Sequence, residues 1–397
     1  MQVVSAQRRP DDNADHAERT TMSKNVVYIL GAGFSAPLGI PVMSEFLTKA
    51  KYMYATRKNT GMVDPIFETL DRLDKTKRFF SSDLFNIEEV LSILTMENRL
   101  GTQLPVVQQA FQQLIAEVIL HHTPQLPPPA GDVHVEMSQS FPGVISESEW
   151  NPYTHFVANL IGMTIVGHHI KREGPPHRTF RIDAEATRPG TNVNTEYSVI
   201  TLNYDLIIEK LAEFFHSLTQ HTFPPPGVAT STSDSQAKYI GFSFQLMRLA
   251  KLHGTAADPK TIVPPTWDKN VSQRILEAWR LAYELLSQAN EIRIIGYSLP
   301  AGDTYVHYLL KSAVLKTTNL HAIDVICHDP DGSVKARYDQ FMDNKRYRFV
   351  NGLTQDYLGQ VSSEGFTQTT GPSPVITYSF LGLEAAHKSY MSDALTS

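Results

Sequence analysis

Four short groups of residues could do chemistry, and each one follows or adjoins an apolar run. They are Gly31-Ala32-Gly33-Phe34-Ser35, Thr201-Leu202-Asn203-Tyr204-Asp205, Lys251-Leu252-His253-Gly254-Thr255 and Gly296-Tyr297-Ser298. The first group, with Ala36 after it, fits the turn of a dinucleotide-binding unit, where glycine lets the backbone turn sharply and approach a pyrophosphate. The alternative for this pattern is a tight strand–helix turn that binds no ligand.

The other three groups bring amide, imidazole and hydroxyl side chains to the ends of predicted strands. Asn203 offers an amide, and His253 beside a glycine could act as a general base near neutral pH. Ser298 can donate a hydrogen bond to a phosphate or a ribose. Structural interpretations compete with each of these roles. Asn203 or Asp205 could start a helix, the histidine is one of 15, and Gly296-Tyr297-Ser298 could be a turn before a helix.

The elements that must position these groups are apolar runs rich in β-branched residues. Runs at 26–30, 197–202, 292–295 and 322–326 predict buried strands, and their near-continuous apolar character is typical of a parallel sheet covered on both faces. Helical patterns alternate with them. We therefore expect an α/β fold with a Rossmann-like parallel sheet, helices on both faces and a mostly helical insertion.

The organisation of the chain follows from the same patterns. We expect a disordered extension at 1–22, one α/β domain at 23–353 and a polar C-terminal tail at 354–397. Residues 52–194 contain no convincing sheet strand and are expected to form the largely helical insertion. Ser44 is expected to cap a helix, and Asp303 another.

Composition bounds the class of protein. The chain has 397 residues, of which 42% are hydrophobic and 19% charged, and its net charge of −6 gives no broad attraction to nucleic acid. It lacks a run long enough to cross a bilayer and an apolar secretory leader, so we expect a cytoplasmic protein with no membrane partner. Its single cysteine, Cys327, excludes an internal disulfide and a four-cysteine zinc site.

In their order along the chain, the four groups resemble the signatures of the sirtuin superfamily. Gly31-Ala32-Gly33-Phe34-Ser35, continued by Gly39-Ile40-Pro41, is similar to the opening G-A-G-x-S…G-I-P, and Thr201-Leu202-Asn203-Tyr204-Asp205 to T-Q-N-I-D. Leu252-His253-Gly254 resembles the family's L-H-G, and Gly296-Tyr297-Ser298 its G-T-S. The resemblance covers roughly residues 26–338 and is weakest in the insertion.

The departures from the family pattern indicate which branch is similar. The deacylases usually continue G-I-P with Asp-Phe-Arg, where this chain has Val42-Met43-Ser44, and their zinc module needs four cysteines. Asn203-Tyr204-Asp205, Pro264-Pro265-Thr266-Trp267 and Gly296-Tyr297-Ser298-Leu299-Pro300 with Asp303 resemble the bacterial sirtuin-like branch instead. Many members of that branch hydrolyse NAD in anti-phage defence. Cys327-His328-Asp329-Pro330 replaces an Asn that the family often has at the last strand.

The resemblance implies an NAD hydrolase (NADase) that cleaves the nicotinamide–ribose bond, with NAD as substrate and no zinc. It implies that His253 is the general base and that Asn203 holds the ribose or the attacking water. Asp205 either faces the nicotinamide pocket or only caps a helix. The remaining implied contacts are Gly31, Ala32, Gly33 and Ser35 to the phosphates, and Gly296 and Ser298 to the adenosine half.

Two other functions stay open at this point. One is an NAD-dependent protein deacylase. The other is a non-enzymatic sensor of NAD or ADP-ribose, or an assembly subunit. Because NAD loss is toxic, an NADase would need control by homo-oligomerisation or by a regulatory partner, such as the ATPases or nucleic-acid-guided proteins of relatives. No residue specifies that partner.

Overall fold

The computed structural model describes most of the chain from residue 24 onward. The described ranges are 24–55, 64–75, 79–80, 87–101, 106–124, 134–136, 150–170, 179–186, 195–218, 228–230, 247–263, 273–317, 319–342, 346–364, 366–368, 375–378 and 382–396. The predicted extension at 1–22 and the Pro264-Pro265-Thr266-Trp267 motif lie outside them.

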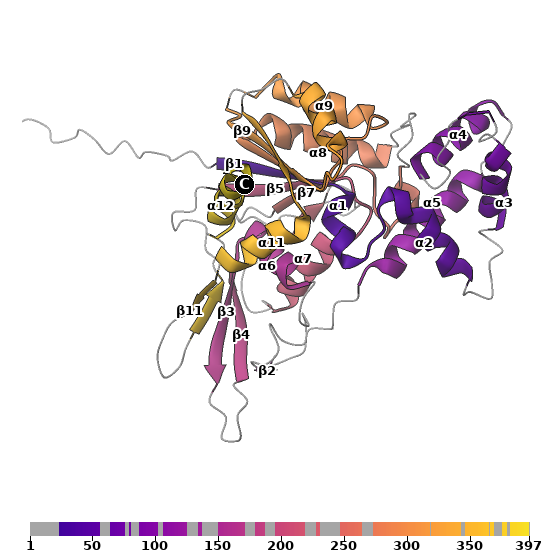
Figure 1. Ribbon diagram of the computed structural model, residues 1–397. Helices are drawn as coiled ribbons and strands as arrows, with labels where there is room; N and C mark the ends of the chain where they lie inside the picture. The colour runs from indigo at the N-terminus through magenta and orange to yellow at the C-terminus, as the bar shows by residue number, and fades with distance from the viewer. Residues whose placement is uncertain are drawn as a thin grey trace, which may run out of the picture.

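A seven-stranded sheet, parallel throughout its described strands, forms the centre of the molecule (Figure 1). Its order is β10-β9-β8-β1-β5-β7-β6. The strands are β1 (Lys24–Leu30), β5 (Thr195–Thr201), β6 (Val228–Thr230), β7 (Met247–Lys251), β8 (Glu291–Ile295), β9 (Ala322–Cys327) and β10 (Tyr347–Asn351). The four predicted strand runs correspond to β1, β5, β8 and β9.

The strand order reverses at β1. On one side of β1 the chain forms β5, then the edge strand β6, and then β7 between them; it crosses over to build β8, β9 and β10 on the other side. A parallel sheet binds its ligand at such a switch point, outside the carboxyl ends of the two strands that flank it. The turns that follow β1 and β8 are therefore the expected place for a site.

Helices cover both faces of this sheet, as predicted. Figure 1 shows α8 (Gln273–Ser287) and α9 (Thr304–Val314) on one side, and α6 (Trp150–Leu160), α7 (Ile207–Leu218) and α11 (Thr354–Glu364) on the other. Alternate residues of β1 divide between the two cores: Val26, Tyr28 and Leu30 pack in one, and Val27 and Ile29 in the other. The near-continuous apolar run thus reflects burial from two sides.

The insertion is mostly helical, as predicted, and also contains strands that the sequence did not indicate. Helix α2 (Met43–Ala55) leads into it, and its helices before α6 are α3 (Asp64–Leu73), α4 (Ile87–Arg99) and α5 (Val106–His122). Because α2 begins at Met43, Ser44 lies in its first turn and is not the residue before the helix, where we expected a cap.

The unexpected strands form a second, antiparallel sheet. Its order is β11-β12-β3-β4-β2, with β2 (His134–Glu136), β3 (Met163–Ile170), β4 (Thr179–Ala186), β11 (Phe366–Gln368) and β12 (Val375–Tyr378). Strand β3 pairs with β12, which comes far later in the chain. A pairing at this separation leaves no local pattern in the sequence.

The residues after 353 contribute to the main core. Helices α11 and α12 (Gly382–Thr396) bury Tyr357, Leu358, Leu383 and Met391 in the same cluster as β1. The predicted boundary at 353 therefore separates segments that pack together. No helix in the described ranges combines the length and apolarity needed to cross a bilayer.

Candidate active site

The turns after β1 and β8 pack backbone against backbone. The Gly31 and Gly33 N–H groups donate to the carbonyls of Ile295 and Gly296, at 3.0 and 2.8 Å. A Cβ added to Gly33 would lie 2.9 Å from Gly296 Cα, and one added to Gly296 would lie 2.3 Å from Phe34 N. Close packing alone thus explains the glycines. These two N–H groups are therefore engaged within the fold, and contact of Gly31 and Gly33 with phosphate stays a prediction.

Asn203 follows β5 and is held by that first turn. Its Nδ2 donates to the Gly31 carbonyl at 2.9 Å and to Ser35 Oγ at 3.0 Å. Since a carbonyl can only accept, the amide has one possible orientation. Its Oδ1 makes no hydrogen bond to any described residue and is left for a ligand.

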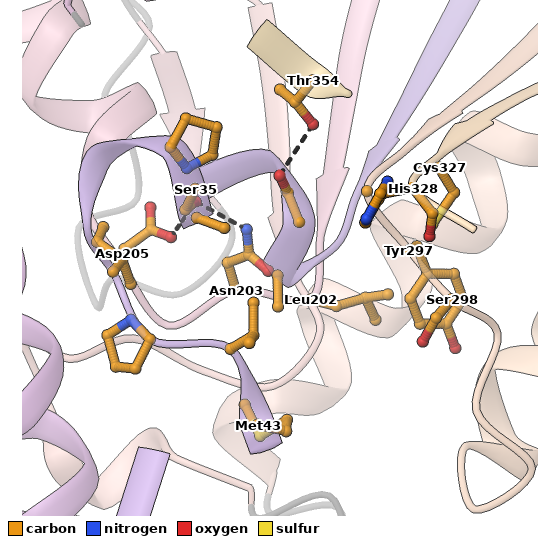
Figure 2. Close-up of a pocket in the computed structure, with 18 of the residues that line it drawn as sticks. Ser35, Met43, Leu202, Asn203, Asp205, Tyr297, Ser298, Cys327, His328 and Thr354 are labelled. Carbon is orange, nitrogen blue, oxygen red and sulfur yellow. Dashed lines mark hydrogen bonds between the residues drawn. The ribbon is translucent and has the colours of Figure 1, made fainter. Parts of the chain in front are cut away.

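Asp205 bonds to the start of a helix, one of the two roles that the sequence left open, and also borders a pocket. Its Oδ1 accepts from the Ile207 N–H at 3.1 Å, at the start of α7, and its Oδ2 accepts from Ser35 Oγ at 2.6 Å. It also lines the pocket described below. Figure 2 shows Ser35 between the Asn203 amide and the Asp205 carboxylate. The Ser35 hydroxyl, which was predicted to contact phosphate, thus donates to Asp205 and accepts from Asn203.

His253 lies in the loop after β7 and is 5% exposed. The His253 carbonyl accepts from the Val263 N–H at 2.9 Å. Gly254 has φ +88°, and a Cβ there would lie 2.2 Å from Thr261 O, so the loop needs glycine beside the histidine. The ring faces a carboxylate, with Nε2 3.5 Å from Asp303 Oδ1.

Asp303 lies at the start of α9 and also reaches the imidazole of His253. It precedes α9, as expected of a cap, but its side chain makes no capping hydrogen bond. Instead its Oδ2 accepts from the Tyr297 hydroxyl at 2.9 Å, and its Oδ1 faces His253. The only available signal was an acidic residue shortly after Gly296-Tyr297-Ser298, which fits a cap equally well.

These groups surround one pocket of about 680 Å³. This volume lies within the range of about 300–1,000 Å³ that is usual for small-molecule sites. Of the predicted site residues, Ala32, Gly33, Ser35, Asn203, Asp205, His253, Gly296 and Ser298 line it, whereas Gly31 lies behind the lining. Lining residues that were not predicted include Asp303, His328, Leu353 and Thr354.

The charged side chains in the described lining of the pocket are carboxylates. Asp205 and Asp303 line it, and no lysine or arginine does so among the described residues. Burial, with a smaller contribution from Asp329, raises the pKa of the Cys327 thiol to about 12, so this lining cysteine is no nucleophile at neutral pH. No group of three or more potential metal ligands occurs in the described ranges.

No family model and no curated protein matches the chain. Solved structures of Sir2 proteins are similar to the chain. One bears on the mechanism and regulation of Sir2 enzymes; it has a TM-score of 0.35 and 13% identity, and covers 86% of this chain and 92% of that one. Sir2 with a p53 peptide and NAD+ has the same TM-score and identity, over 86% and 94%. Sir2 bound to acetylated peptide has 0.34 and 13%, over 86% and 94%.

Proposed function

We propose that this protein is an NAD glycohydrolase that releases nicotinamide and leaves ADP-ribose. The observation that carries this is the convergence of Asn203 and His253 on one pocket beside the turns after β1 and β8. A module that only binds a dinucleotide needs neither an amide with a free acceptor nor an imidazole in that place.

The chemistry requires an imidazole, an amide and a water molecule at the same ribose carbon. The bond between the ribose C1′ and the nicotinamide nitrogen breaks through an oxocarbenium-like state, and its electron pair stays with nicotinamide. A water oxygen bonds to C1′, and its proton passes to the His253 imidazole and then to solvent. The Asn203 Oδ1, fixed by Gly31 and Ser35, accepts a hydrogen bond from that water or from a ribose hydroxyl.

The pocket supports an arrangement of NAD along its length. We place the nicotinamide riboside between Asn203, Asp205 and His253, and the adenosine half toward Gly296 and Ser298, as the sequence resemblance implies. With no basic side chain among the described lining residues, the pyrophosphate would depend on Ala32 and neighbouring backbone dipoles.

The test is chromatography of NAD incubated with purified protein and its variants. Wild type should release nicotinamide, and Asn203→Ala and His253→Ala should each abolish release. Asn319→Ala and His321→Ala change the same residue types at exposed positions and should keep wild-type rates.

Three results would contradict the proposal. Turnover in His253→Ala at the wild-type rate would remove the general base. Nicotinamide release that requires an acetylated peptide would indicate a deacylase. Tight NAD binding without turnover would indicate a sensor.

The resemblance to the bacterial sirtuin-like branch also supports a cellular role, namely NAD depletion in anti-phage defence under the control of self-assembly or a partner. Infected cells that express wild type should lose NAD, and cells that express Asn203→Ala should not. Preserved NAD in both would contradict this role without affecting the proposed chemistry.

A further inference from the structure

Three buried side chains from two loops form a cluster in the lining of the pocket. Tyr297 follows β8, Asp303 precedes α9, and His253 follows β7. The Tyr297 hydroxyl donates to Asp303 Oδ2 at 2.9 Å, and Asp303 Oδ1 lies 3.5 Å from His253 Nε2. All three line the pocket.

The loop that carries Tyr297 and Asp303 is firmly held. The Tyr297 carbonyl accepts from the Tyr338 hydroxyl at 2.8 Å. Leu299, 1% exposed, has φ +50°, a conformation uncommon for a residue other than glycine. Backbone in a sparsely populated region persists only where the surroundings impose it. The strained turn folds the chain back so that Tyr297 and Asp303 face each other.

A capping role does not account for the Asp303 carboxylate. The backbone carbonyl of Asp303 accepts from the N–H groups of Val306 and His307, but its side chain makes no bond to the helix start. Both carboxylate oxygens instead face pocket residues. A buried carboxylate is stabilised by proton donors around it: the Tyr297 hydroxyl donates to one oxygen of Asp303, and the imidazole of His253 lies beside the other.

We propose that Asp303 is a positioning residue for His253, holding the Nε2–H tautomer and stabilising the imidazolium, a role that rests on the hydrolase function proposed above. The separation of 3.5 Å is longer than a good hydrogen bond. Such contacts commonly shorten when substrate is bound.

Other titratable groups in the lining of the pocket could also interact with the His253 imidazole. They are Tyr204, whose ring centroid lies 6.2 Å from that of the imidazole, together with Asp205, Cys327 and His328. Asp205 is engaged by Ser35 and the start of α7. Among the described lining residues, Asp303 is therefore the carboxylate placed to pair with the imidazole.

Asp303→Asn is the decisive variant because it removes the charge and keeps the size and an oxygen acceptor for Tyr297. We expect kcat for nicotinamide release to fall roughly 10- to 100-fold with KM little changed, as when the partner that orients a functional histidine is lost. Asp339→Asn, at an exposed position, is the matched control and should be neutral.

A measurement that needs no turnover separates this role from the function itself. The His253 ring, assigned by the signal lost in His253→Gln, is titrated by nitrogen NMR in wild type and Asp303→Asn. In Asp303→Asn it should titrate at lower pH, because the imidazolium loses its partner, and the Nε2–H tautomer should be less populated. If the charge variant does not fold, Tyr297→Phe should shift the titration of His253 in the opposite direction, to higher pH, because Asp303 keeps its charge and loses the hydroxyl that donates to it.

The outcomes are distinguishable. An unchanged titration and tautomer of His253 would overturn the role of Asp303, whatever the activity. A shifted titration in a protein that never cleaves NAD would support the pairing of Asp303 with His253 and contradict the proposed hydrolase function.

Discussion

At the scale of single residues, hydrogen-bond direction defines the roles around Asn203. The Gly31 carbonyl must accept, so the Asn203 amide donates to it and to Ser35. Because Ser35 Oγ donates its one proton to Asp205 Oδ2, it can only accept from the amide. What the ligand meets is thus an amide oxygen oriented by a serine that itself need not touch the ligand.

Ser35→Ala should therefore damage both stability and activity. It leaves an Asn203 N–H and an Asp205 oxygen buried without their partner, which costs about 1–3 kcal/mol of unfolding free energy. Nicotinamide release should fall about tenfold, mainly in kcat, as the amide loses its fixed orientation. Denaturant unfolding and steady-state kinetics measure the two effects.

Ser44→Ala is the matched control for this change. Ser44 lines the same pocket at an exposed position and has no part in the hydrogen-bonded chain. Wild-type kinetics for both variants would show that Ser35 does not position Asn203.

At the scale of elements, buried charges attach α12 to the sheet. Arg293 on β8 is 1% exposed and pairs with Glu384 of α12 at 2.9 Å and with Glu291 at 2.7 Å. His387 of α12 bonds to Asp324 on β9 at 2.8 Å. Burial opposes ionisation of Glu384, but Arg293, with help from Lys24, outweighs it and lowers the pKa of Glu384 to about 2.

Glu384→Gln should destabilise the protein at neutral pH by about 2–3 kcal/mol, because Arg293 loses a charged hydrogen-bond partner in the interior. Since the folded pKa is depressed, the carboxylate stabilises the fold fully above its unfolded value of 4.5, and this is lost as pH falls toward about 2. Denaturant unfolding over this acid range should show a shallower decline in the variant. Parallel curves would contradict the assignment.

The imidazole of His387 contributes to a second range of acid pH over which the folded protein loses stability. Burial, and then the Arg293 charge, lower the pKa of its imidazole below 6.5, against the opposing bond to Asp324. The unfolded chain therefore gains a proton below pH 6.5 that the folded chain does not, and stability declines as pH falls from there.

His387→Gln should remove this part of the decline between about pH 7 and about pH 5.5, measured by denaturant unfolding at both values. His321→Gln, at an exposed position, is the control and should behave as wild type. An equal decline in His387→Gln and wild type would show that this imidazole does not set the window.

At the scale of the whole molecule, local features were predictable and distant partnerships were not. The strands β1, β5, β8 and β9 and the turns that follow them are visible because burial on both faces leaves an apolar run that ends in glycine or polar residues. The convergence of Asn203 and His253 follows from strand ends meeting at one edge of a parallel sheet.

The features that the sequence missed depend on residues far apart in the chain. Asp303 has the local pattern of a helix cap, and its contact with His253 exists only in the fold. Likewise, Thr354, which donates to the Gly33 carbonyl at 2.9 Å, begins a segment whose polar composition conceals its buried face. Residue composition averages the exposed and buried faces of such a segment, so a polar average does not exclude a buried face.

A chain truncated after residue 353 tests where the domain ends. It would lose α11 and α12, expose the core around Tyr28 and leave Arg293 without Glu384. We expect it to be insoluble or to unfold without cooperativity, as judged by calorimetry beside the full chain. A cooperative transition close to that of the full chain would support the predicted boundary.

If the pocket takes NAD, the ligand should stabilise the fold as a unit, because it contacts turns from both halves of the sheet. The His253→Ala variant is suited to this, since it should bind NAD without consuming it. A ligand at 100 times its Kd adds about 2.7 kcal/mol to the free energy of unfolding, which for a chain of this size raises Tm by about 3 °C. ADP-ribose should stabilise wild type and variant alike, and sodium pyrophosphate at equal ionic strength should have a smaller effect. Equal, small shifts with all three compounds would mean that the pocket senses only anions, and the dinucleotide would have to bind elsewhere.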